Sequence, residues 1–180
     1  MVYVLLGEGF EETEAITPID LLRRASITVR TVGIQGEVIT GGHGIAVHAD
    51  ITLEQMDLAR MEMIVLPGGL GGVSSVLGSA AALEAVRFAH ENNKWIAAIC
   101  AAPTVLARLG ITDGRHATCY PGCEDQMGSA VMEPNRAFVR DGKLITGTSA
   151  GCALPFGLAL VAALKDQQTA DEVARQFVIR

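Results

Sequence analysis

Trp95-Ile-Ala-Ala-Ile-Cys100-Ala-Ala-Pro103-Thr-Val-Leu-Ala107 is the segment that decides the fold. Its first half is an unbroken apolar run of strand length, and Pro103 stands where the first turn of a following helix tolerates proline. The segment therefore predicts a buried strand that turns directly into a helix, with Cys100 at the turn.

A thiol in that position has two interpretations. The unpaired backbone N–H groups and the positive dipole end of a helix N-terminus favour thiolate over thiol, which makes a nucleophile. A free cysteine is also often a small buried hydrophobe, and the neighbouring alanines suit either interpretation. Because the helix start and Pro103 favour the functional interpretation, we take Cys100 as the candidate nucleophile.

Outward from this segment, apolar runs alternate with helix-period segments along almost the whole chain. The predicted strands are residues 2–6, 27–33, 63–66, 96–99 and 117–120; the predicted helices are 11–25, 80–92, the segment after Cys100, 153–164 and 170–177; strand pairs are predicted over 37–50 and over 137–139 with 143–146. Strands that are apolar on both faces indicate a mostly parallel sheet covered by helices on both sides. The length of 180 residues fits one domain, residues 1–180.

Such a sheet brings the C-terminal ends of its parallel strands to one edge, where ligands bind. Leu6-Gly7, Pro67-Gly68-Gly69, Cys100 and Tyr120 each follow a predicted strand, so we expect them to converge. The glycine-rich loop over residues 67–72 lets backbone N–H groups approach a ligand and hold a developing oxyanion. A plain tight turn explains the same residues, and the loop alone is weak support for a site.

Glu14 is the carboxyl group expected to face this edge from the inside. It shares one stripe of its helix with Pro18, Leu21 and Ala25, which are all apolar. Burial would raise its pKa, and a protonated carboxyl group beside a thiol can donate and shuttle a proton. Glu11 and Glu12 are more simply interpreted as complementing the dipole at the start of the helix.

Composition excludes several classes of protein. An apolar content of 49% with 19% charged residues is typical of a folded, well-packed protein, and a net charge of −6 without a basic stripe argues against binding nucleic-acid backbones. The acidic N-terminal residues do not resemble a secretory signal, and the longest apolar runs are too short for a membrane span. We therefore expect a cytoplasmic protein whose four cysteines are reduced thiols.

Three other motifs compete with Cys100. Gly147-Thr-Ser149-Ala-Gly151 matches the nucleophile elbow of serine hydrolases, but no histidine follows it. His116, Cys119 and Cys123 have poor zinc spacing and lack a fourth ligand. The remaining histidines, His43, His48 and His90, are most simply solvated or capped side chains.

In combination, three motifs resemble the ThiJ/PfpI superfamily. They are Glu11-Glu-Thr-Glu14 followed by Pro18-Ile-Asp20, then Leu66-Pro-Gly-Gly69, then Ala98-Ile-Cys-Ala-Ala-Pro103. The sequence is most similar to the protein deglycase branch linked to Parkinson disease, the "DJ-one" group, with its bacterial relatives. The likeness continues through residues 125–127, 141–142 and 156–160, nearly to the end of the chain.

The resemblance implies a flavodoxin-like three-layer α/β/α sandwich, usually dimeric, with a reactive cysteine at the elbow. By motif match, Cys100 is the nucleophile and Glu14 its protonated partner, and the backbone amides of Gly69 and Ala101 form the anion pocket beside Gly68 and Tyr120. The implied substrates are α-oxoaldehydes such as methylglyoxal, without glutathione, and early glycation adducts. The implied alternative is a redox sensor or chaperone-like protein that uses an oxidisable Cys100.

Two departures from the superfamily narrow this expectation. Ala101 stands where the protease branch has a histidine, and the downstream residues that amidotransferases need are missing, so both activities are disfavoured. Tyr120 stands before Pro121, where the deglycase branch often has a histidine, and a phenol is a poorer base at neutral pH. The sequence predicts a cytoplasmic protein with no membrane or nucleic acid involved. The resemblance adds the expectation of a homodimeric enzyme without metal or organic cofactor, whose partners are small reactive aldehydes or glycated groups.

Overall fold

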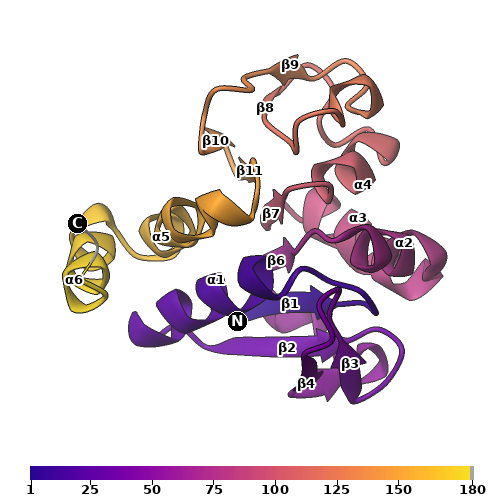
Figure 1. The fold of residues 1–180 in the computed structure, drawn as a ribbon, viewed down its shortest axis with the longest axis horizontal. Helices are drawn as coiled ribbons and strands as arrows, with labels where there is room; N and C mark the ends of the chain where they lie inside the picture. The colour runs from indigo at the N-terminus through magenta and orange to yellow at the C-terminus, as the bar shows by residue number, and fades with distance from the viewer. Residues whose placement is uncertain (179–180) are drawn as a thin grey trace.

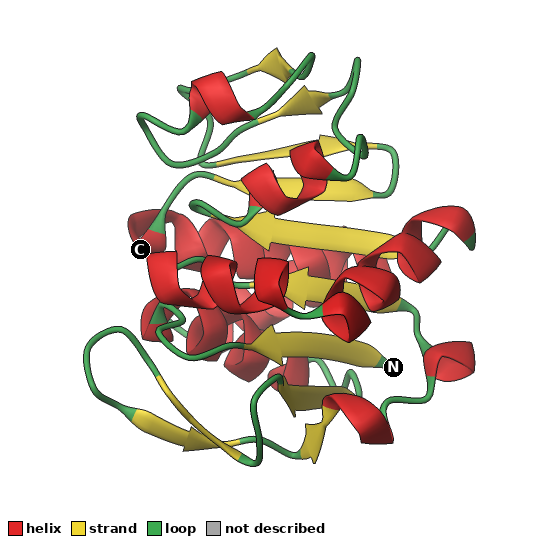
Figure 2. Cartoon of the chain, turned by 90° about the vertical axis from the view of Figure 1, so that its right-hand side faces the viewer, coloured by secondary structure: helices red, strands yellow, loops and turns green. Residues whose placement is uncertain are grey.

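A seven-stranded sheet forms the centre of the computed structural model, which describes residues 1–178. The strand order is β10-β11-β7-β6-β1-β2-β5, and every neighbouring pair is parallel except the β10–β11 hairpin. Figure 2 shows these strands stacked in one sheet with helices in front of it and behind it. The strands are β1 (Val2–Leu6), β2 (Val29–Gly33), β5 (Ile51–Thr52), β6 (Met63–Leu66), β7 (Trp95–Ile99), β10 (Phe138–Asp141) and β11 (Leu144–Gly147).

Helices cover both faces of this sheet (Figure 1). One face carries α1 (Glu12–Arg24), α5 (Ala153–Leu164) and α6 (Gln167–Gln176), and the other carries α2 (Leu70–Gly78), α3 (Ala80–Glu91) and α4 (Pro103–Arg108). The flavodoxin-like α/β/α sandwich is therefore confirmed. The last two residues of the predicted 1–180 domain lie outside the described part of the chain.

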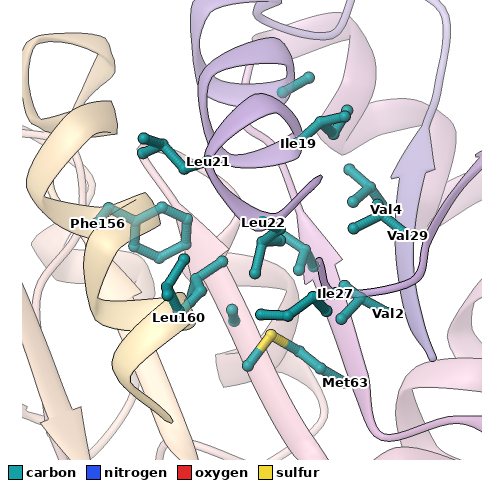
Figure 3. Packing of buried hydrophobic residues seen from close by; sticks show 14 of the residues in the cluster. Val2, Val4, Ile19, Leu21, Leu22, Ile27, Val29, Met63, Phe156 and Leu160 are labelled. Atoms are coloured by element: carbon teal, nitrogen blue, oxygen red, sulfur yellow. The ribbon is translucent and has the colours of Figure 1, made fainter. Parts of the chain in front are cut away.

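Side chains along β1 alternate between the two faces of the sheet, so this strand contributes to both hydrophobic clusters. Val2 and Val4 face the cluster shared with α1 and α5, whereas Tyr3 and Leu5 face the cluster shared with α2, α3 and α4. In Figure 3, Leu22 of α1 packs among residues of the first cluster beside the valines of β1. Burial on both faces explains why the strands are continuous apolar runs in the sequence.

Helix α2 lies partly in the segment predicted to be a glycine-rich loop. The helix begins at Leu70, directly after Gly69. Its first turn is pressed against the loop that follows β1, since a Cβ on Gly71 would lie 2.7 Å from the Glu8 carbonyl oxygen and one on Gly72 2.8 Å from the Phe10 Cα. Close packing thus favours glycine here and outweighs its poor helix propensity.

The predicted strand at residues 117–120 is wrong. The strand is β8 (His116–Ala117), which pairs in parallel with β9 (Val131–Met132) outside the central sheet. The next residue, Thr118, donates its backbone N–H to Thr146 Oγ1 at 2.9 Å, so a side chain replaces strand pairing there.

The remaining elements are short. The predicted hairpin over residues 37–50 is present as β3 (Val38–Thr40) and β4 (Ala46–His48). Four 3₁₀ turns are η1 (Leu53–Gln55), η2 (Leu58–Arg60), η3 (Glu124–Gln126) and η4 (Ala150–Cys152). Among the described helices, none has both the length and the apolar character needed to cross a membrane.

Candidate functional site

Cys100 lies in a sharp turn between β7 and α4. Its φ is +66°, in the left-handed region that residues other than glycine rarely adopt. Backbone hydrogen bonds hold the turn, because the Cys100 N–H donates to the Gly147 carbonyl at 3.0 Å and the Cys100 carbonyl accepts from the Tyr120 N–H at 2.7 Å. The thiol is therefore placed at the C-terminal edge of the sheet by a strained, backbone-fixed elbow.

The helix after this elbow begins later than predicted. Helix α4 starts at Pro103 and has six residues, so Cys100 does not stand at its N-terminus. Two individual backbone N–H groups, those of Ala101 and Gly69, instead favour the ionised form of the sulfur and lower the pKa of Cys100. Two neighbouring backbone N–H groups, rather than the dipole of α4, therefore favour the thiolate form of Cys100.

Glu14 points into the interior as the helical spacing predicts. It is 1% exposed, and its Oε2 accepts a hydrogen bond from the Gly68 N–H at 2.9 Å. Its Oε1 is buried and, among the described residues, has no hydrogen-bond partner. A buried oxygen of this kind has a free position for one further hydrogen bond.

Glu14 and Cys100 titrate as a pair. Burial raises the pKa of Glu14 to about 7, and the charge of Glu11 adds to the rise, while hydrogen bonds with Cys100 and Gly68 oppose it. Burial likewise raises the pKa of Cys100 to about 12, and the charge of Glu14 is the next cause. The expectation of an intrinsically acidic thiol is therefore wrong. Above about pH 7 the pair holds one proton, and Cys100 is a thiolate when that proton lies on Glu14.

Gly68 lies between Glu14 and Cys100, and its lack of a side chain lets these two residues come close to each other. A Cβ on Gly68 would lie 2.6 Å from Glu14 Oε2, 2.7 Å from Cys100 Cβ and 3.0 Å from the Ile99 carbonyl oxygen. Gly69 follows with a φ of +85°, and a Cβ there would lie 2.6 Å from the Glu11 backbone nitrogen. Only glycines permit this approach of the β6–α2 connection to the elbow.

Tyr120 reaches the site through its backbone, in the turn that follows β8. Its N–H holds the Cys100 carbonyl, while its side chain is 49% exposed. The structure therefore brings all six sequence-predicted residues to one place, namely Cys100, Glu14, Gly68, Gly69, Ala101 and Tyr120.

Gly147 and Glu12 are parts of this region that the sequence did not assign. Gly147 ends β11 beside β7, and the parallel pairing of these two strands places its carbonyl against Cys100. Glu12 is buried rather than a solvated dipole partner, and its carboxylate accepts hydrogen bonds from the His43 N–H at 2.8 Å and the Ile45 N–H at 3.4 Å. Three glycines flank His43 in the sequence, and they are the feature that could have indicated a tight turn packed against another element.

Glu11, Glu12 and His43 are the described residues whose potential metal-ligating atoms lie closest together, all within 4.8 Å. His43 Nδ1 lies 2.8 Å from Glu12 Oε2 and 3.5 Å from Glu11 Oε2. Burial acts to raise the pKa of Glu12, but the hydrogen bonds from His43 and Ile45 outweigh it and hold that pKa at about 2. An ion pair that fastens the hairpin to α1 accounts for this cluster.

The competing motifs are accounted for by other contacts. His116 pairs through Nδ1 with Glu133 Oε1 at 2.7 Å, and Cys119 is buried in a small apolar cluster, with Cys123 packed against it. Ser149 donates its hydroxyl to Cys152 Sγ at 3.8 Å.

Comparison with known proteins gives one consistent result. A protein that is similar in sequence is Protein dj-1beta of Drosophila melanogaster, which is 35% identical over 178 residues, or 98% of this chain and 95% of the relative. A deglycase of Pyrococcus abyssi is 32% identical over 132 residues, or 73% of this chain and 79% of the relative.

Solved structures agree with the sequence relatives. The crystal structure of Drosophila melanogaster DJ-1beta matches with a TM-score of 0.94 and 34% identity, covering 99% of this chain and 97% of that one. Toxoplasma gondii DJ-1, in a structure described as oxidized, matches with a TM-score of 0.91 and 29% identity, covering 98% and 97%. Residues 1–163 match the model of one family, and with them the whole predicted site, so the chain belongs to the DJ-1/PfpI family.

Proposed function

We propose that the chain is a cysteine-dependent enzyme that converts α-oxoaldehydes to hydroxy acids, or removes the related early glycation adducts, without metal or organic cofactor. The observation that carries the proposal is the buried carboxyl group of Glu14 beside the Cys100 thiol, with the N–H groups of Gly69 and Ala101 directed at the sulfur. The deglycase name of the Pyrococcus abyssi relative supports it.

The proposed reaction begins with the shared proton on Glu14. The Cys100 thiolate attacks the aldehyde carbon, and Glu14 gives its proton to the carbonyl oxygen, which forms a hemithioacetal. Glu14 then moves the proton from that carbon to the neighbouring carbonyl carbon through an enediol, so the first carbon is oxidised and the second reduced. Water hydrolyses the resulting thioester to the hydroxy acid and restores the thiol.

Turnover of methylglyoxal to lactate tests this proposal. We expect the wild-type protein to form lactate and Cys100→Ser and Glu14→Gln to lose most of that activity, since each removes one half of the pair. Cys152→Ser serves as the matched control and should retain activity. Lactate formation by Cys100→Ser would contradict the mechanism.

A second candidate function is redox sensing through Cys100. It is supported by the unpartnered Oε1 of Glu14, which could donate a hydrogen bond to a sulfinate oxygen when protonated, and by the structural relative described as oxidized. Mild peroxide followed by mass spectrometry should oxidise Cys100 before Cys119, Cys123 and Cys152. Oxidation of another cysteine first would contradict sensing at this site.

Homodimerisation and small aldehyde or glycated partners belong to the same proposal. Family membership supports them. Sedimentation of the full chain tests the dimer, and a monomer across the micromolar range would contradict it.

A further inference from the structure

Two large exposed apolar side chains belong to backbone segments that contact the Cys100 elbow. Leu70 is 84% exposed, more than any other large apolar side chain in the described residues, and Tyr120 is 49% exposed. Leu70 directly follows Gly69, whose backbone N–H lowers the pKa of Cys100, and the Tyr120 N–H is bonded to the Cys100 carbonyl. Exposed apolar groups next to a reactive centre indicate a surface for an apolar ligand group.

Packing of α2 explains why Leu70 remains exposed. Gly69, Gly71 and Gly72 all lie against residues 8–11, with too little space for a Cβ at any of them. That side of the first helical turn is therefore closed, and Leu70 is the only side chain larger than hydrogen among residues 68–72. It closely follows Gly68, at which a Cβ would lie 2.7 Å from Cys100 Cβ.

The charges around the thiol are negative. Glu14 lies at the sulfur, and the charge of Glu11 is close enough to raise the pKa of Glu14. Glu12 adds a third carboxylate, which is paired with His43. A substrate that carries its own carboxylate would meet this negative field on entering the pocket.

We propose that this site selects uncharged α-oxoaldehydes whose carbonyl carries an apolar or aromatic group, with Leu70 and Tyr120 as the residues that cover that group. The inference rests on the proposed function and narrows its substrate class. Small α-oxoaldehydes without such a group leave both side chains uncovered, and anionic ones are disfavoured by the carboxylates.

Steady-state kinetics with three substrates test the selection. We expect kcat/KM to be higher for phenylglyoxal than for methylglyoxal, and lower for 4-carboxyphenylglyoxal than for phenylglyoxal. In Leu70→Ser/Tyr120→Ser the phenylglyoxal to methylglyoxal ratio should fall about tenfold, the size expected when an apolar contact is lost. Val38→Ser, which alters a residue that is 55% exposed on β3, is the matched control and should keep the wild-type ratio. An unchanged ratio in the double variant overturns the inference, even if lactate formation is intact.

Alkylation of Cys100 gives a readout that does not depend on turnover. N-phenyl iodoacetamide should alkylate Cys100 faster than iodoacetamide relative to their rates with free cysteine, and iodoacetate should be slower. The preference for the phenyl reagent should be lost in Leu70→Ser/Tyr120→Ser. If the protein turns over no aldehyde but keeps this pattern, the proposed function fails and the apolar selectivity of the site stands. If the three reagents show no preference, the selectivity fails whatever the activity.

Discussion

At the residue scale, the site depends on one shared proton. Burial raises the pKa of both Cys100 and Glu14, and an ionised Glu14 raises the pKa of Cys100 further, whereas the neighbouring thiol lowers that of Glu14. The backbone N–H groups of Gly69 and Ala101 are fixed donors that stabilise negative charge on the sulfur. Reactivity at neutral pH therefore belongs to the pair rather than to the thiol.

This arrangement predicts the pH dependence of Cys100 alkylation. The pKa of Glu14 is raised to about 7, so below that pH both groups are protonated and above it one proton is shared. The alkylation rate with iodoacetamide should rise through about pH 7. Glu14→Gln removes the site of the shared proton and also the Glu14 charge that raises the pKa of Cys100, so the inflection near pH 7 should disappear and the rate should instead rise through the lowered pKa of the thiol alone. An inflection near pH 7 that persists in Glu14→Gln would show that another group is responsible.

Gly68 gives a steric prediction for the same pair. A Cβ would press on the Glu14 carboxylate, on Cys100 and on the Ile99 carbonyl, and the strand backbone cannot move aside cheaply. Gly68→Ala should reduce the free energy of unfolding by about 2 kcal/mol, as overpacked sites do. It should also slow alkylation of Cys100, because the carboxylate is displaced.

Urea denaturation and alkylation kinetics measure these two effects. Gly78→Ala is the control, because nothing lies within 4 Å of a Cβ at Gly78. Equal stability and equal alkylation rates for Gly68→Ala and the control would refute the close packing.

At the element scale, the periodicity of the sequence predicted the features that depend on local sequence. It missed the features that depend on packing between distant segments. The inward position of Glu14 followed from helical spacing. Helix α2 was missed entirely because Gly71 and Gly72 oppose helix formation, and only their contact with residues 8–11 explains them. The left-handed turn at Cys100 has no sequence signal, because it is held by Gly147 and Tyr120 from distant parts of the chain.

Glu12 gives a prediction about the β3–β4 hairpin. Its pKa is held at about 2, below the ordinary value of 4.5 for glutamate, so its ionised form stabilises the fold. This contribution is fully present above about pH 4.5 and is lost as the pH falls through about 2. Glu12→Gln should lower the free energy of unfolding at pH 7 by about 2 kcal/mol, because a buried charged hydrogen-bond acceptor is lost.

Denaturation curves at several pH values test whether the ionised form of Glu12 stabilises the fold. The difference between Glu12→Gln and wild type should shrink as the pH falls from 4.5 toward 2. Glu37→Gln is the control, since Glu37 is an exposed residue whose only ion pair within residues 1–178 is a 3.9 Å contact with His48. A difference that grows on acidification would mean that Glu12 does not anchor the hairpin as an anion.

At the scale of the whole molecule, the site stands where the two cores meet at the sheet. Glu14 comes from the helix layer of α1 and α5, whereas Gly69 directly precedes α2 on the opposite face. Cys100 lies at the end of β7, between the layers. The geometry of the pair therefore depends on how both layers dock on one sheet, which no local pattern in the sequence encodes.

Phe156 tests this coupling between core and site. It is fully buried in α5, and a Cβ on Gly147 would lie 2.9 Å from its ring, so the ring packs on the residue whose carbonyl holds Cys100. Phe156→Ala should cost about 4 kcal/mol of unfolding free energy, the typical loss for a buried phenylalanine. It should also alter the alkylation rate of Cys100 under conditions where the variant is still folded, because Gly147 loses its support. Phe88→Ala, a partly exposed residue packed on the opposite core, should lose less stability and keep the wild-type rate. If Phe156→Ala lowers stability but leaves the alkylation rate of the folded protein unchanged, the elbow is held by its backbone hydrogen bonds alone, and the helix layer does not control the thiol.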